Sequence, residues 1–349
     1  MRVLVDFHHH DLWESLELLC DRLGWDLYRP IGMEWFEREY WNFERKWHND
    51  AVAHQYLDLW GSDRNAGDHW ERDDRSHPGR VQKMLSLAQA RDLRPDIVIA
   101  SVAHNHEGLH RFASEAGAHF GIHLGNVRFS AIDMAEDRWD LAEFGIVTSL
   151  LPVTPPKPHV VVHQEFSLLD YRYEPPQVHR PLRISSFVNC FAENLAGYAQ
   201  FRGTAALLPE IDWRIYGSYG SVAEDEFAAG NLSTCASVGD AMRASDVGLH
   251  TKVWSDGFGH VVHNWFAVGR PVLGFEWYYR SQLAGPLWQE GITSFDLTDK
   301  SPDDVVRLIH WLDDERIERM SANAAARFRE VVSFDEEERT IRAMFETIL

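Results

Sequence analysis

The sequence predicts an α/β fold with two parallel β-sheets, and three observations support this class. Short apolar segments alternate with segments whose apolar residues recur at helical spacing along most of the 349 residues. This alternation pauses at an extended polar stretch near residues 170–182 and then restarts. The length also suits two domains better than one. Strands that alternate with helices form parallel sheets with both faces covered, so we expect one such sheet in each half.

In the first half, residues 2–7 predict a strand, and the leucines of 12–23 lie at helical spacing before Gly24. A polar and aromatic insertion occupies residues 32–78. The other elements expected in this half are strands at 25–28, 96–102, 119–124 and 160–163, helices at 81–90 and 107–116, and a helix–strand passage at 140–150.

The second half repeats the pattern, and its final helix places Ile341, Met344 and Phe345 on one face. The strands expected there are 182–188, 213–216 and 246–250, with a further strand opening at Pro271. The expected helices are 192–208, 238–244, 303–313, 315–330 and 334–349, together with one inside 254–271.

The segment at 254–271, WSDGFGHVVHNWFAVGRP, is the most informative part of the chain. Its order indicates a strand end, a tight glycine turn, a helix and the next strand. Glycines let the backbone approach a ligand closely, and the N-terminus of the following helix offers free N–H groups to an anion. Asp256 and Asn264 bracket this turn, where a diphosphate and a ribose could lie.

This segment resembles the donor-site signature of GT-B glycosyltransferases, in particular the retaining family with an E-x7-E motif. Asp256 stands at the first glutamate of that motif and Asn264 at the second. Asparagine can still hydrogen-bond ribose hydroxyls, but it carries no charge. The residues that match the glycine turn and the tail of the signature are Gly257, Phe258, Gly259, Ala267, Gly269, Pro271 and Val272. Weaker similarities follow in the family's order at 94–106, 120–126, 160–173, 215–217 and 236–247.

The resemblance implies a GT-B fold, with two Rossmann-like domains that face each other across a cleft. Residues 1–175 would form the acceptor-side domain, including the insertion at 32–78. Residues 176–333 would form the nucleotide-sugar domain, and the helix at 334–349 would cross back to the first domain. The implied activity is a glycosyltransferase of the hexosyltransferase type.

Lys252 is the leading candidate for neutralising the donor diphosphate, because it follows a predicted strand at the edge where α/β sheets bind ligands. The family's Arg/Lys pair at the start of the second domain has no counterpart here, and Arg202 is the nearest arginine. We assign Lys252, Asp256, His8 and His106 as catalytic. The expected donor-binding residues are Gly217, Val238, His250, Lys252, Gly257, Phe258, Gly259, His260 and Asn264.

Histidines follow two predicted strands of the first half. His8, His9 and His10 come after the first strand, and we expect them to contact the sugar or the acceptor; metal ligation and surface exposure are the alternatives. His104 and His106 come after the strand at 96–102. A histidine there suits a general base for an acceptor hydroxyl, and a polar cap for the next helix is the alternative.

The five tryptophans of the insertion suggest three roles. They could stack on an acceptor, pack as the apolar face of a helix, or form a homodimer interface. The residues are Trp35, Trp41, Trp47, Trp60 and Trp70.

Composition limits the partners and the compartment. A net charge of −20 argues against a non-specific nucleic-acid binder, so a nucleic acid enters only as a candidate acceptor beside glycan, lipid and protein. The three cysteines are widely spaced, and we expect a reducing cytoplasm and no membrane span. No Asp-x-Asp occurs, which favours a metal-independent reaction. The resemblance implies a nucleotide sugar, UDP- or GDP-linked, as co-substrate and no other cofactor.

Two other functions compete with a glycosyltransferase. One is a nucleotide-sugar epimerase, or a phosphorylase, on the same two-domain plan. The other is a catalytically degenerate GT-B protein that binds a nucleotide sugar without turnover, which the replacement of both glutamates favours. The donor, the acceptor and the stereochemical outcome are not readable from the sequence.

Overall fold

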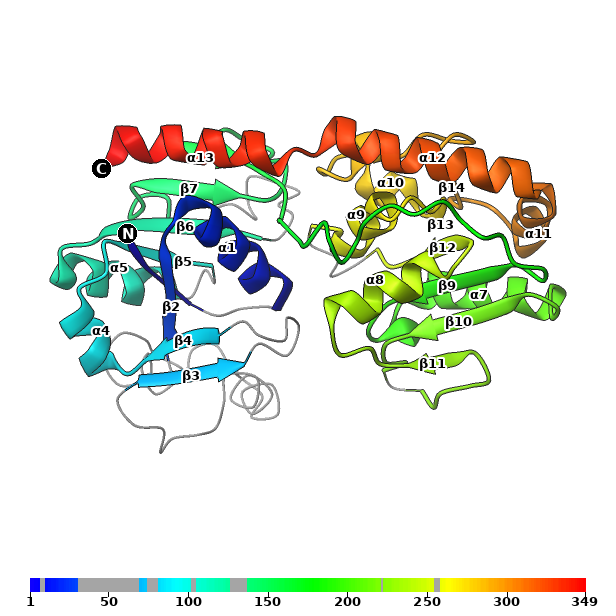
Figure 1. Cartoon of the computed structure of the whole chain (residues 1–349), viewed down its shortest axis with the longest axis horizontal. Helices are drawn as coiled ribbons and strands as arrows, with labels where there is room; N and C mark the ends of the chain where they lie inside the picture. Colours follow the sequence, from blue (N-terminus) through cyan, green and yellow to red (C-terminus); the bar gives the residue numbers. More distant parts are fainter. Residues whose placement is uncertain are drawn as a thin grey trace. The chain divides into compact units, whose positions relative to one another are not determined.

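The computed structural model describes residues 1–6, 10–30, 69–73, 81–101, 105–125, 137–220, 222–253 and 258–349 (Figure 1). The chain divides into two compact units, and each contains one β-sheet. Unit 1 comprises Met1–Asp74, Pro78–Phe166 and Phe334–Leu349, and unit 2 comprises Arg75–His77 and Ser167–Ser333.

The described strands of unit 1 form a sheet in the order β3-β4-β2-β1-β5-β6-β7-β8. All neighbours are parallel except β3 and β4, which are antiparallel. The strands are β1 (Arg2–Val5), β2 (Asp26–Pro30), β3 (His69–Asp73), β4 (Val81–Leu85), β5 (Ile97–Ala100), β6 (His119–Leu124), β7 (Phe144–Val147) and β8 (His159–Val161). Strand order reverses between β1 and β5, so these two strands flank the switch point of the sheet.

Helices α1 (His10–Leu23), α4 (Leu87–Leu93), α5 (His106–Ala116) and α13 (Phe334–Ile348) belong to this unit. The C-terminal helix α13 returns to unit 1 from the other end of the sequence and packs against α1 and β8. Its Phe345 ring contacts Trp25 and Phe144 edge to face, at centroid distances of 4.9 and 4.7 Å. The apolar face predicted for this helix therefore lies in the core of unit 1.

The helix predicted at 81–90 is wrong for its first half. Residues 81–85 are the strand β4, which is parallel to β2 and antiparallel to β3. Ser86 then caps α4, with its hydroxyl accepting from the Gln89 backbone and the Gln89 side chain accepting from the Ser86 backbone. Pairing with two neighbouring strands outweighs the local preference of this segment for a helix.

Unit 2 contains a fully parallel sheet in the order β11-β10-β9-β12-β13-β14. Its strands are β9 (Arg183–Phe187), β10 (Asp212–Tyr216), β11 (Ala228–Gly230), β12 (Val247–His250), β13 (Val272–Gly274) and β14 (Ser294–Asp296). After β9, the next strands β10 and β11 extend the sheet toward one edge. After β12, strands β13 and β14 extend it toward the other edge. The switch point of this sheet therefore lies between β9 and β12.

The helices of unit 2 cover both faces of this sheet, because right-handed crossovers in opposite directions place α7 and α9 on opposite faces. Helix α11 packs against α7, and α12 packs against α9. The elements are η3 (Phe191–Glu193), α7 (Leu195–Leu207), α8 (Cys235–Arg243), α9 (His260–Ala267), α10 (Glu276–Tyr279), η4 (Gly285–Leu287), α11 (Pro302–Trp311) and α12 (Asp314–Val331).

Candidate functional site

The carboxyl edge of the unit 2 sheet places several predicted donor residues near the switch point. The loop after β9 and the loop after β12 leave adjacent strands there. Asn194, just before α7, donates its side-chain amide to the carbonyl oxygen of Thr251 at 2.6 Å. Gly197 lies against the same threonine, since a Cβ atom at Gly197 would meet its hydroxyl at 2.5 Å. These contacts hold the two loops at the switch point together.

The loop after β10 joins this arrangement through backbone contacts. Gly217 has a positive φ of 106°, and a Cβ atom there would meet the carbonyl oxygen of Val188 at 2.5 Å. Only glycine satisfies both conditions without strain. The predicted donor residue Gly217 thus lets the loop after β10 approach the loop after β9. Val238 is half-buried on α8.

Lys252 follows β12 by two residues and is half-buried. Its ammonium group makes no ion pair with any residue in the described ranges. The backbone around it is fixed, because the Tyr279 hydroxyl donates to the Lys252 carbonyl oxygen at 3.0 Å. The same hydroxyl lies 2.7 Å from Nε2 of His250, which is buried at the end of β12.

Helix α9 begins at the far side of the loop that follows Lys252. Its N-cap is Gly259, in the left-handed region with φ of 78°. A Cβ atom there would meet the Tyr279 ring at 3.0 Å, so the glycine allows the turn to pack on that ring. The ring of Phe258 stacks on His263 at a centroid distance of 4.0 Å. His260 is the first residue of the helix, whose N-terminal N–H groups face the turn.

Asn264 lies in the second turn of α9 and is 2% exposed. Its side-chain oxygen is buried and has no hydrogen-bond partner among the residues that the structure describes. An unpaired buried acceptor costs on the order of 1–3 kcal/mol, so such an atom is expected to have a partner in the working state of the protein. A bound hydroxyl group would supply one.

Arg202, the first arginine after strand β9, is occupied by another contact. Its guanidinium forms an ion pair with Asp225 at 2.6 Å, and it lies over the ring of Phe227. This geometry leaves Lys252 as the cation at the switch point in the described part of the loops.

The switch point of unit 1 is organised by Asp6, directly after β1. Its carboxylate accepts from the backbone and hydroxyl of Ser101, both at 2.5 Å, and from the Asn105 side chain at 2.7 Å. His106 begins α5 and is 0% exposed, with Nδ1 accepting from the Arg138 backbone at 3.2 Å. The predicted base is therefore fully buried at the start of α5, and its catalytic role stays a prediction.

Several predicted site residues lie outside the described residues: His8, His9, His104, Asp256 and Gly257. The insertion also lies mostly outside them, although its strand β3 is described. His10 begins α1. Tyr279 and Asn194 were not predicted from the sequence, because only tertiary packing brings them to the loop after β12.

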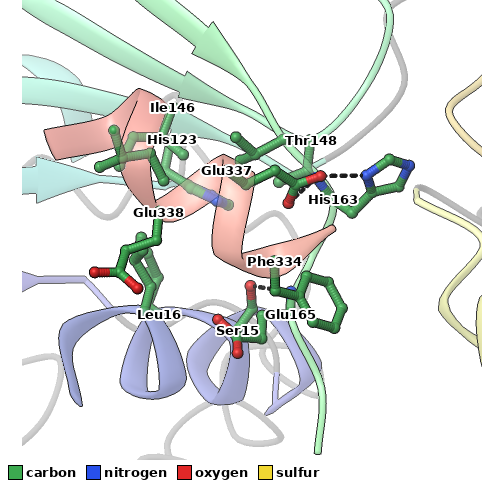
Figure 2. A pocket seen from close by; sticks show the side chains of 13 residues that line it. Ser15, Leu16, His123, Ile146, Thr148, His163, Glu165, Phe334, Glu337 and Glu338 are labelled. Carbon is green, nitrogen blue, oxygen red and sulfur yellow. Dashed lines mark hydrogen bonds and ion pairs between the residues drawn. The ribbon is translucent and has the colours of Figure 1, made fainter. Parts of the chain in front are cut away.

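A separate small pocket lies within unit 1, with space of about 20 Å³, enough for one water molecule. Figure 2 shows a dashed line between the lining residues His163 and Glu337, where Nδ1 of the histidine lies 2.6 Å from the carboxylate. Glu165 donates its backbone N–H to the Ser15 hydroxyl at 2.8 Å, and its carboxylate pairs with Arg22. Burial raises the pKa of Glu165, and Arg22 opposes that rise. The pocket is too small for a sugar.

The described residues contain no group of three His, Cys, Asp or Glu side chains placed to hold a metal ion. None of the described helices combines the length and the apolar character needed to cross a membrane. Metal independence and a cytoplasmic location stay predictions.

Comparison with known proteins finds likeness in structure alone. No protein-family model matches the chain, and no curated protein matches its sequence. The solved structure of Anabaena Alr3699/HepE in complex with UDP-glucose aligns with a TM-score of 0.65 and 13% identity, covering 99% of this chain and 100% of that one. Sucrose-phosphate synthase from Thermosynechococcus elongatus aligns with a TM-score of 0.64 and 11% identity, over 100% and 99% of the two chains.

A third likeness is partial. The pneumococcal O-GlcNAc transferase GtfA, in complex with UDP and GlcNAc, aligns with a TM-score of 0.54 and 16% identity, over 76% of this chain and 61% of that chain. Full-length likeness to such proteins, with two parallel sheets, shows that this chain has the GT-B fold. The fold class predicted from the sequence is confirmed.

Proposed function

We propose that this protein is a glycosyltransferase that moves a sugar from a nucleotide-sugar donor to an acceptor hydroxyl, without a metal ion. The observation that carries the proposal is the carboxyl edge of the unit 2 sheet. There, an ammonium group without an ion pair in the described ranges, a glycine-capped helix N-terminus and a buried unpaired amide oxygen follow one another between the end of β12 and the second turn of α9. These groups suit a diphosphate and the hydroxyls of a ribose.

The structural neighbours support the same class. The HepE structure holds UDP-glucose, and the GtfA structure holds UDP and GlcNAc. Because these two proteins are 13% and 16% identical to this chain, their ligands suggest a donor class for it but no particular sugar. The resemblance to the E-x7-E family, with Asp256 and Asn264 in the positions of the two glutamates, is part of the proposal, which assigns no stereochemical outcome.

The chemistry proposed for the donor side is stabilisation of the leaving group. Negative charge builds on the nucleoside diphosphate as the bond to the sugar breaks. Lys252 and the N–H groups at the start of α9 would stabilise this charge more in the transition state than in the bound donor. Asn264 would accept from a ribose hydroxyl, and Gly217, Val238, His250 and His260 would line the nucleotide site.

The acceptor side is proposed to lie on unit 1. His8, His9, His10 and His104 would contact the acceptor, and His106 would act as the general base. The acceptor itself is unidentified. The epimerase alternative gains no support from the structural neighbours, and the degenerate binding protein is an outcome that the assay below distinguishes.

The test is calorimetric titration with UDP, GDP, UDP-glucose, UDP-GlcNAc and GDP-mannose, followed by measurement of nucleotide release from each sugar donor. We expect one nucleotide to bind and its sugar donor to be hydrolysed slowly, at the same rate with an excess of EDTA as with Mg²⁺. Binding without hydrolysis or transfer would identify a binding protein. Loss of turnover in EDTA that Mn²⁺ restores would overturn metal independence.

A further inference from the structure

Tyr279 occupies a central place beneath the loop that follows β12. It is the last residue of α10, which comes after the neighbouring strand β13, and its side chain is 0% exposed. Its hydroxyl contacts the residue two positions after β12, and its ring contacts the N-cap of α9. One side chain therefore touches both ends of the loop that carries the proposed diphosphate site.

The hydrogen bonds at this hydroxyl have a defined direction. A tyrosine hydroxyl has one proton, and here it is donated to the carbonyl oxygen of Lys252 at 3.0 Å. Nε2 of His250 lies 2.7 Å from the same oxygen, so this nitrogen must carry a proton and donate it. The chain of bonds thus runs from the end of β12, through the hydroxyl of Tyr279, to the backbone of Lys252.

The ring of Tyr279 is held rigidly. It stacks on Trp288 at a centroid distance of 5.6 Å and an interplanar angle of 13°. Gly259 packs on its edge, since a Cβ atom there would lie 3.0 Å from the ring. A rigid support of this kind is what a preorganised site requires, because small displacements of a charged group lower its effect on the transition state.

We propose that Tyr279 is a positioning residue that fixes Lys252 relative to the N-terminus of α9, so that both act on the departing nucleoside diphosphate. This inference rests on the proposed function. The hydroxyl sets the position of the lysine backbone, and the ring sets the position of the glycine turn. Neither group contacts the donor in this assignment.

Tyr279→Phe tests the proposal, because it removes the hydroxyl and keeps the ring with its contacts to Trp288 and Gly259. Steady-state release of nucleotide is measured with whichever of UDP-glucose, UDP-GlcNAc and GDP-mannose the wild-type protein hydrolyses. We expect kcat to fall roughly tenfold, because the hydroxyl would no longer hold Lys252 in its position. KM for the donor should change less than about threefold. The melting temperature should stay within about 3 °C of wild type, as for loss of about 1 kcal/mol or less.

Two companion variants separate positioning from a merely structural role. Tyr278→Phe removes a hydroxyl from the adjacent ring of α10, and its kcat should equal that of the wild type. His250→Gln keeps a donor N–H close to the position of Nε2, whereas His250→Ala does not, so the glutamine variant should retain several times the kcat of the alanine variant.

Each outcome has one reading. A Tyr279→Phe protein with the wild-type kcat overturns the positioning role and leaves the proposed function intact. The same holds if the variant melts at a lower temperature but has the wild-type kcat when it is assayed below that temperature. Equal kcat for His250→Gln and His250→Ala also overturns it. A wild-type protein that binds none of the nucleotides and hydrolyses none of the donors overturns the proposed function, and the inference with it.

Discussion

Lys252 carries the largest share of the proposed chemistry, since it supplies the fixed positive charge of the turn. We expect Lys252→Ala to lower kcat by about 10²-fold or more, with a smaller loss of donor affinity, because the charge on the leaving group is greater in the transition state. Steady-state kinetics of donor hydrolysis measures both quantities. Lys300→Ala removes the same charge from another half-buried lysine of unit 2 and serves as the matched control. Near wild-type turnover of the Lys252 variant would contradict the assignment.

Asn264 provides a second test at the same scale. Its buried oxygen has no partner within the described ranges, so Asn264→Ala breaks no described side-chain hydrogen bond and should leave the fold intact. We expect nucleotide affinity to fall by about 1–3 kcal/mol, or roughly 5- to 150-fold in Kd, because a ribose hydroxyl loses its acceptor. Calorimetric titration measures this change. An unchanged Kd would remove the residue from the donor site.

These two residues are predictions that come from local pattern, and they stay predictions. Lys252 follows an apolar strand, and Asn264 occurs at a fixed spacing within a glycine-containing segment. Tyr279 and Asn194 could not be predicted in this way, because their contacts join segments about 27 and 57 residues apart along the chain. The same limit applies to His106, whose complete burial depends on packing between α5 and residue 138.

At the scale of elements, Arg270 joins the end of α9 to two other segments of unit 2, one at residue 174 and one at residues 243–245. Its guanidinium donates to the carbonyl oxygens of Ser245 (2.8 Å), Glu174 (2.9 Å) and Arg243 (2.6 Å), and it is 1% exposed. Burial lowers the pKa of this arginine to about 10, so it remains charged at neutral pH. Arg270 is the arginine of the Gly-Arg-Pro sequence at the end of the signature.

We expect Arg270→Met to destabilise the protein by about 3–5 kcal/mol, because several buried carbonyl groups lose their donor at once. Chemical denaturation followed by tryptophan fluorescence measures the free energy of unfolding. Arg307→Met, on an exposed face of α11, is the control and should cost less than about 0.5 kcal/mol. A loss below about 1 kcal/mol for Arg270→Met would show that the carbonyl groups find other donors.

The stability of the unit 1 sheet should depend on pH through Asp96. The hydrogen bond from the Arg2 guanidinium holds the pKa of this carboxyl below its ordinary value of 3.8, in part against desolvation. A lowered pKa in the folded state means that the stabilisation is complete above about pH 4 and disappears as the pH falls through the folded-state value. Asp96→Asn should therefore destabilise the protein at pH 7, and the difference in stability from the wild type should shrink as the pH falls below about 4. Parallel stability curves across this range would contradict the role of the ion pair.

Element prediction succeeded where apolar segments were long or clearly periodic. Strand β6 (119–124) and helix α13 were expected within a residue of their observed bounds. The elements β11, β14 and α10 were missed because they contain three or four residues, too few to show a period. Residues 81–85 were misassigned because a strand between two partners depends on those partners more than on its own sequence.

At the scale of the whole molecule, the GT-B fold is the feature that the sequence pattern and the structural neighbours share. Two parallel sheets, each with its own switch point, give two separate edges of the kind at which α/β sheets bind ligands. The partition into an acceptor domain at 1–175 and a nucleotide domain at 176–333 stays a proposal. Its central claim is that the nucleotide binds to unit 2.

A crystal structure of the protein with UDP, or with GDP if titration favours it, tests that claim most directly. The account predicts density for the diphosphate between the Lys252 ammonium and the N-terminus of α9, with a ribose hydroxyl within about 3 Å of the Asn264 side-chain oxygen. Nucleotide bound at the switch point of unit 1, beside Asp6 and Asn105, would contradict it.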